Sequence, residues 1–189
     1  MRIREKRIRS SLLGTAFMVV SIFCIAQETA LDLDGHPVNP LNTDKVVVLV
    51  FLRRDCPVSA RYAPEIQRIS KQYAGVAQFW LVDPDRSDTV EQIRKYLSDY
   101  SYRLPVLRDS SRALVKLSRV QITPEVAVFS RDHQLVYDGR IDNWYVDLSR
   151  ARPSPTTHEL EDAIRSASIG KAAAQSEVRG VGCYISDLD

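Results

Sequence analysis

Cys56 stands where a reactive thiol could form. It opens the motif Cys-Pro-Val-Ser at residues 56–59, directly after the apolar run at residues 46–52. A continuous run of β-branched residues predicts a buried strand, and Pro57 is typical of the first turn of a helix. Because the first N–H groups of a helix stabilise negative charge, we expect Cys56 to have a lowered pKa and a nucleophilic thiolate. The alternative is a buried, inert cysteine at the end of a strand.

Cys183 is the second residue that can take part in thiol chemistry. It lies in Gly182-Cys183-Tyr184, close to the C-terminus. A tail cysteine can resolve a mixed disulfide or a sulfenic acid on Cys56. It can equally form a permanent disulfide with Cys56, worth about 4–5 kcal/mol in the chain-entropy model, or make no contact with it. These three alternatives stay open, because geometry decides between them.

The segments between these cysteines alternate between strand and helix patterns, which predicts parallel strands joined by crossover helices. Pro64 is expected to kink the first helix, Ser87 or Asp88 to cap the second, and Asp109 or Ser110 to cap the third. The closing hairpin turns at residues 131–133. The expected strands cover residues 46–52, 76–82, 104–107, 125–130 and 134–138, and the expected helices cover 57–73, 89–100, 112–119 and 157–168.

Three features resemble the thioredoxin superfamily. Residues 46–73 lead from a strand into a cysteine that begins a helix, and Pro64 follows that cysteine by eight residues. Ile122-Thr123-Pro124 before the hairpin is similar to the cis-proline loop of the family. Leu33-Asp34-Gly35 is similar to the start of the exported redoxin branch, which includes the alkyl-hydroperoxide-reductase/thiol-specific-antioxidant group and the periplasmic thioredoxin-like oxidoreductases.

This resemblance covers roughly residues 31–167 and implies an α/β thioredoxin-like fold, a central mixed sheet with helices on both faces. It implies that Thr123 and Pro124 shape the face on which the substrate backbone docks. We also assign Pro57 and Arg54 to substrate binding. The expected domain spans residues 31–169, and residues 170–189 form a tail, of which residues 171–180 are expected to be a solvated linker.

The motif departs from the family pattern at several positions. Ser59 occupies the place of the second cysteine of Cys-x-x-Cys, so the dithiol reaction cannot run within this motif. A serine hydroxyl can still hydrogen-bond the thiolate. Val50 replaces the buried acid of thioredoxin, and Asp55 replaces the usual aromatic residue. Arg53 stands where peroxiredoxins carry a threonine, which speaks against peroxidase chemistry, although Arg53 or Arg54 can bind a peroxide oxygen.

The N-terminal segment resembles a secretory signal. Residues 1–26 hold five of the 26 basic and one of the 24 acidic residues. These charges come first, and an apolar stretch fills the rest of the segment, as in a secretory signal. The rest of the chain therefore carries a net charge of −2, and we expect no nucleic-acid partner. We expect export to the periplasm or the extracellular space, with residues 11–26 kept as a membrane anchor if the signal is not cleaved. In an oxidising compartment Cys56 and Cys183, the two cysteines outside residues 1–26, can form a disulfide.

The residues favour an exported thiol–disulfide oxidoreductase that acts on protein or small-molecule disulfides and thiols. Cys56 is the nucleophile, Ser59 tunes it, and Cys183 or an external thiol reductant resolves the intermediate. We expect no cofactor and no metal, because the three histidines, His36, His133 and His158, lie in separate turns and loops. Two alternatives remain: a one-cysteine thiol peroxidase that takes peroxide, and a non-catalytic thioredoxin-fold binding module.

Overall fold

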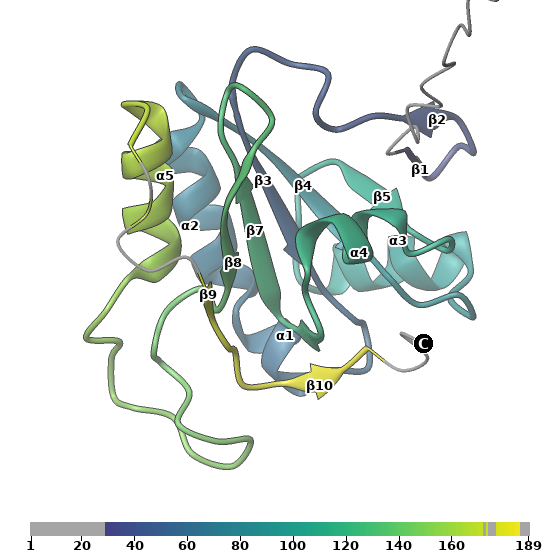
Figure 1. Cartoon of the computed structure of the whole chain (residues 1–189). Helices are drawn as coiled ribbons and strands as arrows, with labels where there is room; N and C mark the ends of the chain where they lie inside the picture. Colours follow the sequence, from purple (N-terminus) through teal and green to yellow (C-terminus); the bar gives the residue numbers. More distant parts are fainter. Residues whose placement is uncertain (1–28, 172, 174–176, 186–189) are drawn as a thin grey trace, which may run out of the picture.

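The computed structural model describes residues 29–171, 173 and 177–185 (Figure 1). Its main sheet has the strand order β2-β1-β5-β4-β3-β7-β8-β9, and a second sheet pairs β10 with β6. The strands are β1 (Ala30–Leu31), β2 (Pro37–Val38), β3 (Val46–Phe51), β4 (Ala77–Asp83), β5 (Val106–Arg108), β6 (Ile122–Thr123), β7 (Glu125–Phe129), β8 (Leu135–Gly139), β9 (Glu177–Val178) and β10 (Cys183–Tyr184).

Strand β3 lies in the middle of the main sheet, as its apolar sequence predicts. It runs parallel to β4 and antiparallel to β7, and all six of its residues are buried. Val46, Val48 and Val50 face one core cluster, whereas the alternating residues Val47 and Leu49 face a second cluster on the other side of the sheet. A strand buried on both faces explains the unbroken apolar run.

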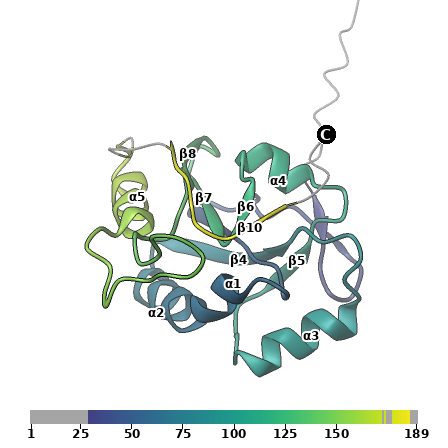
Figure 2. The same ribbon diagram turned by 90° about the horizontal axis from the view of Figure 1, so that it is seen from below.

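Helices cover both faces of the sheet (Figure 2). The first core cluster holds residues of four helices and the second holds residues of one, α4. The fold is therefore the α/β thioredoxin-like arrangement that the sequence predicts. The helices are α1 (Pro57–Arg61), α2 (Ala63–Tyr73), α3 (Val90–Asp99), α4 (Ala113–Ser118) and α5 (Glu159–Ser168), and α4 is the one on the second face.

The first helix differs from its prediction. We expected one helix over residues 57–73 with a kink at Pro64, but the structure divides it into α1 and α2 at Tyr62. Pro64 has no N–H to donate to Ala60, so the helical ladder is interrupted there and Tyr62 ends one helix and begins the next. The thiol motif therefore opens a helix of only five residues.

The predicted helix caps are also wrong in part. Helix α3 is capped by Thr89, which forms a capping box with Gln92, and not by Ser87 or Asp88. At α4 the residue before the helix is Arg112, in the left-handed region. The Asp109 carboxylate still accepts the N–H of Val115, in the first turn of α4, at 2.8 Å. The expected acid therefore caps the helix, although it lies three residues before Arg112.

The C-terminal residues pack against the domain. We call residues 177–185 the strap. Its first part, β9, pairs in parallel with β8, so the prediction of a solvated linker over residues 171–180 is wrong for Glu177 and Val178. Its second part, β10, pairs antiparallel with β6 and crosses beside α1 (Figure 2). The expected signal or anchor within residues 1–26 lies outside the described residues, and no helix among the described ones is long and apolar enough to span a membrane.

Candidate active site

Cys56 lies at the centre of the candidate site. It occupies the N-cap position of α1 and is completely buried. Its sulfur donates a hydrogen bond to the carbonyl oxygen of Thr123 at 3.0 Å. The peptide bond between Thr123 and Pro124 is cis, as the resemblance implies. The structure thus brings together the cysteine and the proline loop that the sequence assigned to one site. Pro57, the first residue of α1, is exposed beside them.

Cys183 is brought directly to this cysteine by the strap. In the β10–β6 pair Cys183 is the register partner of Thr123, whose hydroxyl donates to the Cys183 carbonyl oxygen at 3.3 Å. Both the thiol and the backbone N–H of Cys183 hydrogen-bond to Cys56. Both thiols are free. Of the three alternatives from the sequence, absence of contact is therefore wrong.

The two thiols differ in acidity. Burial alone would raise the pKa of Cys56, but hydrogen bonds from Ser59 and from Cys183 outweigh it and lower that pKa. For Cys183, burial and the neighbouring Cys56 sulfur raise the pKa to about 11. Of the two thiols Cys56 is therefore the more acidic, and it is the one that ionises first and acts as the nucleophile.

Ser59 supports the thiolate in two ways. Its backbone N–H and its hydroxyl both lower the pKa of Cys56. The hydroxyl is fully buried and has no other hydrogen-bond partner in the part of the chain that the structure describes. A buried donor with no alternative partner gains most when the sulfur becomes charged. The helix N-terminus thus acts on Cys56 through the Ser59 N–H.

We expect Ser59→Ala to slow alkylation of Cys56 by iodoacetamide by about tenfold at a pH below the thiol pKa, since one hydrogen bond to a charged group is worth about 1.5–3 kcal/mol. The pKa of Cys56 rises in this variant, so its rate profile moves to higher pH. Stopped-time alkylation followed by peptide mass spectrometry across pH measures the shift. Ser98→Ala, at an exposed position of α3, is the control, and coincident profiles for Ser59→Ala and wild type would contradict the role of Ser59.

The two arginines before Cys56 are held by aspartates. Arg53 lies 2.8 Å from Asp55 and also donates to the carbonyl oxygen of Tyr184 in the strap at 3.0 Å. The Arg54 Nε donates to Asp88 at 2.6 Å. Arg54 therefore faces an acidic partner, and its expected role in substrate binding stays a prediction.

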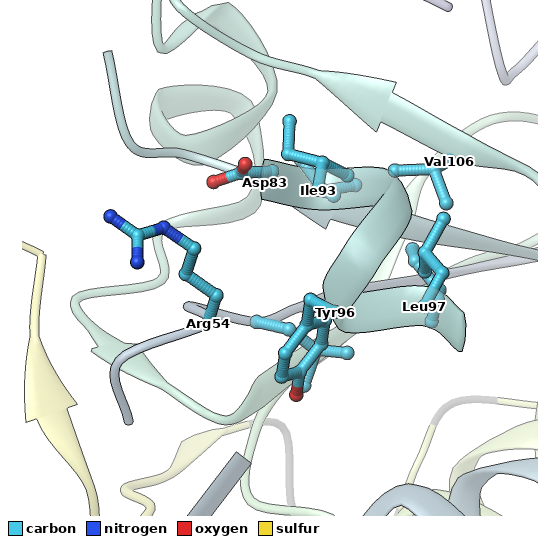
Figure 3. Close-up of a pocket in the computed structure, with 9 residues that line it drawn as sticks. Arg54, Asp83, Ile93, Tyr96, Leu97 and Val106 are labelled. Carbon is cyan, nitrogen blue, oxygen red and sulfur yellow. The ribbon is translucent and has the colours of Figure 1, made fainter. Parts of the chain in front are cut away.

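A small pocket lies beside these arginines, at the carboxyl ends of β3 and β4. Figure 3 shows Arg54 and Asp83 at one end of it and Leu97 and Val106 at the other. Its volume of about 20 Å³ has room for one water molecule. Burial raises the pKa of Asp83 to about 7. Its carboxylate also accepts the N–H of Asp85 at 2.9 Å, just after β4.

Two buried polar contacts near the site were not predicted. The Tyr62 hydroxyl donates to the Asp142 carboxylate at 2.5 Å, and this links the break between α1 and α2 to the loop after β8. Glu125, fully buried beside Pro124, accepts the N–H of Gly180 at 2.8 Å and thereby holds the strap. An acid directly after the Thr-Pro pair was a signal in the sequence, since a buried carboxylate needs partners.

Side chains of the types that bind metals do not gather in the described part of the chain. There, no group of three or more His, Cys, Asp or Glu side chains converges as metal ligands do. The chemistry that the arrangement can perform is exchange between thiols and disulfides. A low-pKa cysteine beside a cis-proline loop, on this fold, defines a thioredoxin-like protein.

The comparisons with known proteins agree with this class. The AhpC/TSA family model matches residues 26–138, more than half of the chain, and the chain therefore belongs to the AhpC/TSA family. A search of the curated proteins finds no match.

Solved structures share the fold. An uncharacterized conserved protein from Geobacillus kaustophilus is 21% identical, with a TM-score of 0.68 over 83% of this chain and 86% of its own. A hypothetical protein from Sinorhizobium meliloti is also 21% identical, with a TM-score of 0.67 over 83% and 88%. A secreted disulfide oxidoreductase of Mycobacterium tuberculosis is 18% identical, with a TM-score of 0.51 over 76% and 95%.

Proposed function

We propose that this protein is an exported thiol–disulfide oxidoreductase that works with two cysteines, Cys56 as the attacking thiolate and Cys183 as the resolving thiol. The observation that carries the proposal is the β10–β6 pairing, which sets Cys183 against Cys56 although 126 residues separate them. The family membership and the secreted disulfide oxidoreductase of the same fold support the reaction class and the export.

The first step consumes the Cys56 thiolate. It attacks one sulfur of a substrate disulfide, a mixed disulfide forms between Cys56 and that sulfur, and the other substrate sulfur leaves as a thiolate. Hydrogen bonds from Ser59 favour the ionised form of the attacking sulfur. Thr123 and Pro124 line the edge on which the substrate lies.

The second step follows from the first. The Cys56 hydrogen bond and charge are among the causes that raise the pKa of Cys183. Once Cys56 is in a mixed disulfide both causes are gone, so the Cys183 pKa falls and its thiolate attacks the Cys56 sulfur. A Cys56–Cys183 disulfide forms and the remaining substrate thiolate leaves. The substrate is thereby reduced by two electrons, and an external thiol reductant returns the pair to its dithiol form.

Before the mixed disulfide forms, Cys183 is a poor nucleophile. A thiol with a pKa near 11 is almost entirely protonated at neutral pH. It therefore neither reacts with oxidants on its own nor competes with Cys56. The substitution of Ser59 for the second cysteine of the motif is in this way compensated by a cysteine from the strap.

Cys183→Ser tests the proposal. We expect the variant to form the mixed disulfide with a small disulfide such as oxidised 2-mercaptoethanol, but to lose multiple turnover by about a hundredfold or more, since external thiols must then resolve Cys56. Stopped-flow and steady-state assays with one reductant measure the two quantities. Tyr184→Ala, at the exposed neighbour of Cys183, serves as the control. Unchanged turnover in Cys183→Ser would overturn the assignment of Cys183.

A further inference from the structure

The strap covers the nucleophile. Cys56 has no exposed surface, and Cys183 of β10 hydrogen-bonds to it. A disulfide sulfur must reach Cys56 in line with the bond that breaks. Because Cys183 of the strap contacts the Cys56 sulfur, the strap stands in that path. Under the proposed function, the resolving strand and the substrate therefore compete for the same place.

The strap is attached in a way that permits it to leave. None of residues 177–184 is buried, and Ile185 is the one strap residue buried within a core cluster, while Val181 and Cys183 pack half-buried against the other cluster. Hydrogen bonds hold the rest: Ile185 N–H donates to the Gln121 carbonyl oxygen at 2.8 Å, Gly180 N–H to the Glu125 carboxylate at 2.8 Å, and the Arg53 side chain to the Tyr184 carbonyl oxygen at 3.0 Å. A segment with few buried apolar contacts opens locally at low free-energy cost.

The covered edge is built for a polypeptide backbone. Ile122 and Thr123 are both buried, and β10 pairs with them residue for residue. A segment that takes the place of β10 and covers this edge again must satisfy the backbone groups of β6, because buried unpaired groups are costly. An extended polypeptide supplies alternating N–H and C=O groups at the correct spacing. A small disulfide does not.

Gly182 shows how closely the strap fits this edge. A Cβ at this position would lie 2.0 Å from the Thr123 carbonyl oxygen and 2.7 Å from its carbonyl carbon, so any larger residue forces β10 away from β6. The glycine therefore allows the strap to pair with β6 with Cys183 in register. A substitution at Gly182 can disrupt this pairing without altering either cysteine.

We infer that β10 is a self-docked occupant of the substrate edge, and that the substrate which displaces it is an extended, cysteine-containing polypeptide segment. This rests on the proposed function and names its substrate class. The strap blocks Cys56 in the resting enzyme and gives way to the segment. It returns after the mixed disulfide has formed, and its return brings Cys183 onto the Cys56 sulfur and expels the reduced segment.

The experiment separates access from ionisation. The rate of Cys56 alkylation is measured across pH in Gly182→Ala, with peptide mapping to resolve each cysteine, and is extrapolated to the fully ionised thiolate. We expect a rise of about tenfold or more, since net loss of one or two hydrogen bonds gives such a factor. Ile185→Ala, which weakens the strap on the other side of Cys183, gives a second variant. Gly75→Ala, where a Cβ meets nothing within 4 Å, is the matched control and is expected to match wild type.

A second readout addresses the substrate class. A ten-residue extended peptide with one cysteine activated as the nitrothiobenzoate disulfide is compared with free cysteine activated in the same way. Cys56 attacks the cysteine sulfur in both, and nitrothiobenzoate leaves as the coloured thiolate. We expect Gly182→Ala to react about tenfold faster with the peptide than with the activated amino acid. Equal rates would overturn the polypeptide assignment.

An unchanged limiting alkylation rate in both Gly182→Ala and Ile185→Ala would overturn the strap as the barrier. Neither readout requires turnover. The inference can therefore fail while the two-cysteine function holds, and Cys183→Ser can contradict that function while the strap still governs access.

Discussion

Cys56→Ser is expected to reduce disulfide exchange to the uncatalysed background, a fall of about three orders of magnitude or more. A serine hydroxyl is not ionised at neutral pH and forms no bond with a substrate sulfur, so both the first step and the Cys56–Cys183 disulfide are lost. The fold should persist, because the substitution exchanges sulfur for oxygen at a position with a hydrogen-bond acceptor, the Thr123 carbonyl, at 3.0 Å. Reduction of a chromogenic disulfide measures the loss.

The matched control for this experiment is Cys183→Ser, in which the first step survives. A Cys56→Ser variant that kept its exchange rate would show that the chain acts through some other group, or that it is a binding module with no thiol turnover. Circular dichroism of both variants establishes that each is folded.

Glu125→Ala is expected to give the second large effect, on stability. Glu125 is fully buried, and its carboxylate accepts the N–H groups of Gln121 at 3.1 Å, Ile122 at 3.3 Å and Gly180 at 2.8 Å. Alanine leaves three donors without a partner. One of these donors, on Ile122, is buried and the other two are part-buried. Since a buried unpaired donor costs about 1–3 kcal/mol, the free energy of unfolding should fall by about 2 kcal/mol or more.

Urea denaturation measures that free energy, with Glu91→Ala as the control. Glu91 is exposed in the first turn of α3, where loss of its charge is worth less than about 1 kcal/mol. Because Glu125 holds both the loop before Pro124 and the strap, Glu125→Ala should also speed alkylation of Cys56. A variant as stable as wild type would contradict the bridging role of this carboxylate.

Much of the fold was predictable, because its central elements carry strong local signals. The run at residues 46–52 has the composition of a strand buried on both faces, and β3 is such a strand. Pro64 was correctly identified as an interruption, although the chain divides at Tyr62. The caps were harder, since several polar residues compete before each helix. The Thr89-x-x-Gln92 pattern was nevertheless a legible capping-box signature.

The candidate site was predictable in its first half. The strand before Cys56 and the Thr123-Pro124 pair before the hairpin led to a cysteine facing a cis-proline loop, which the structure contains. The second half was not, because β9 and β10 are two residues each and have no apolar periodicity. Their placement depends on backbone hydrogen bonds and on the absence of a side chain at Gly182. A single glycine in the sequence does not show which strand the segment pairs with.

The proposed reaction of Cys56 followed by Cys183 is tested most directly by identifying the covalent products of one turnover. The reduced protein is mixed with one equivalent of a peptide disulfide, quenched in acid after a range of times, and mapped by mass spectrometry without reduction. The account predicts a transient peptide adduct on Cys56 followed by a cross-link between the Cys56 and Cys183 peptides. A stable adduct on Cys56 with Cys183 still free, or a first adduct on Cys183, would contradict it.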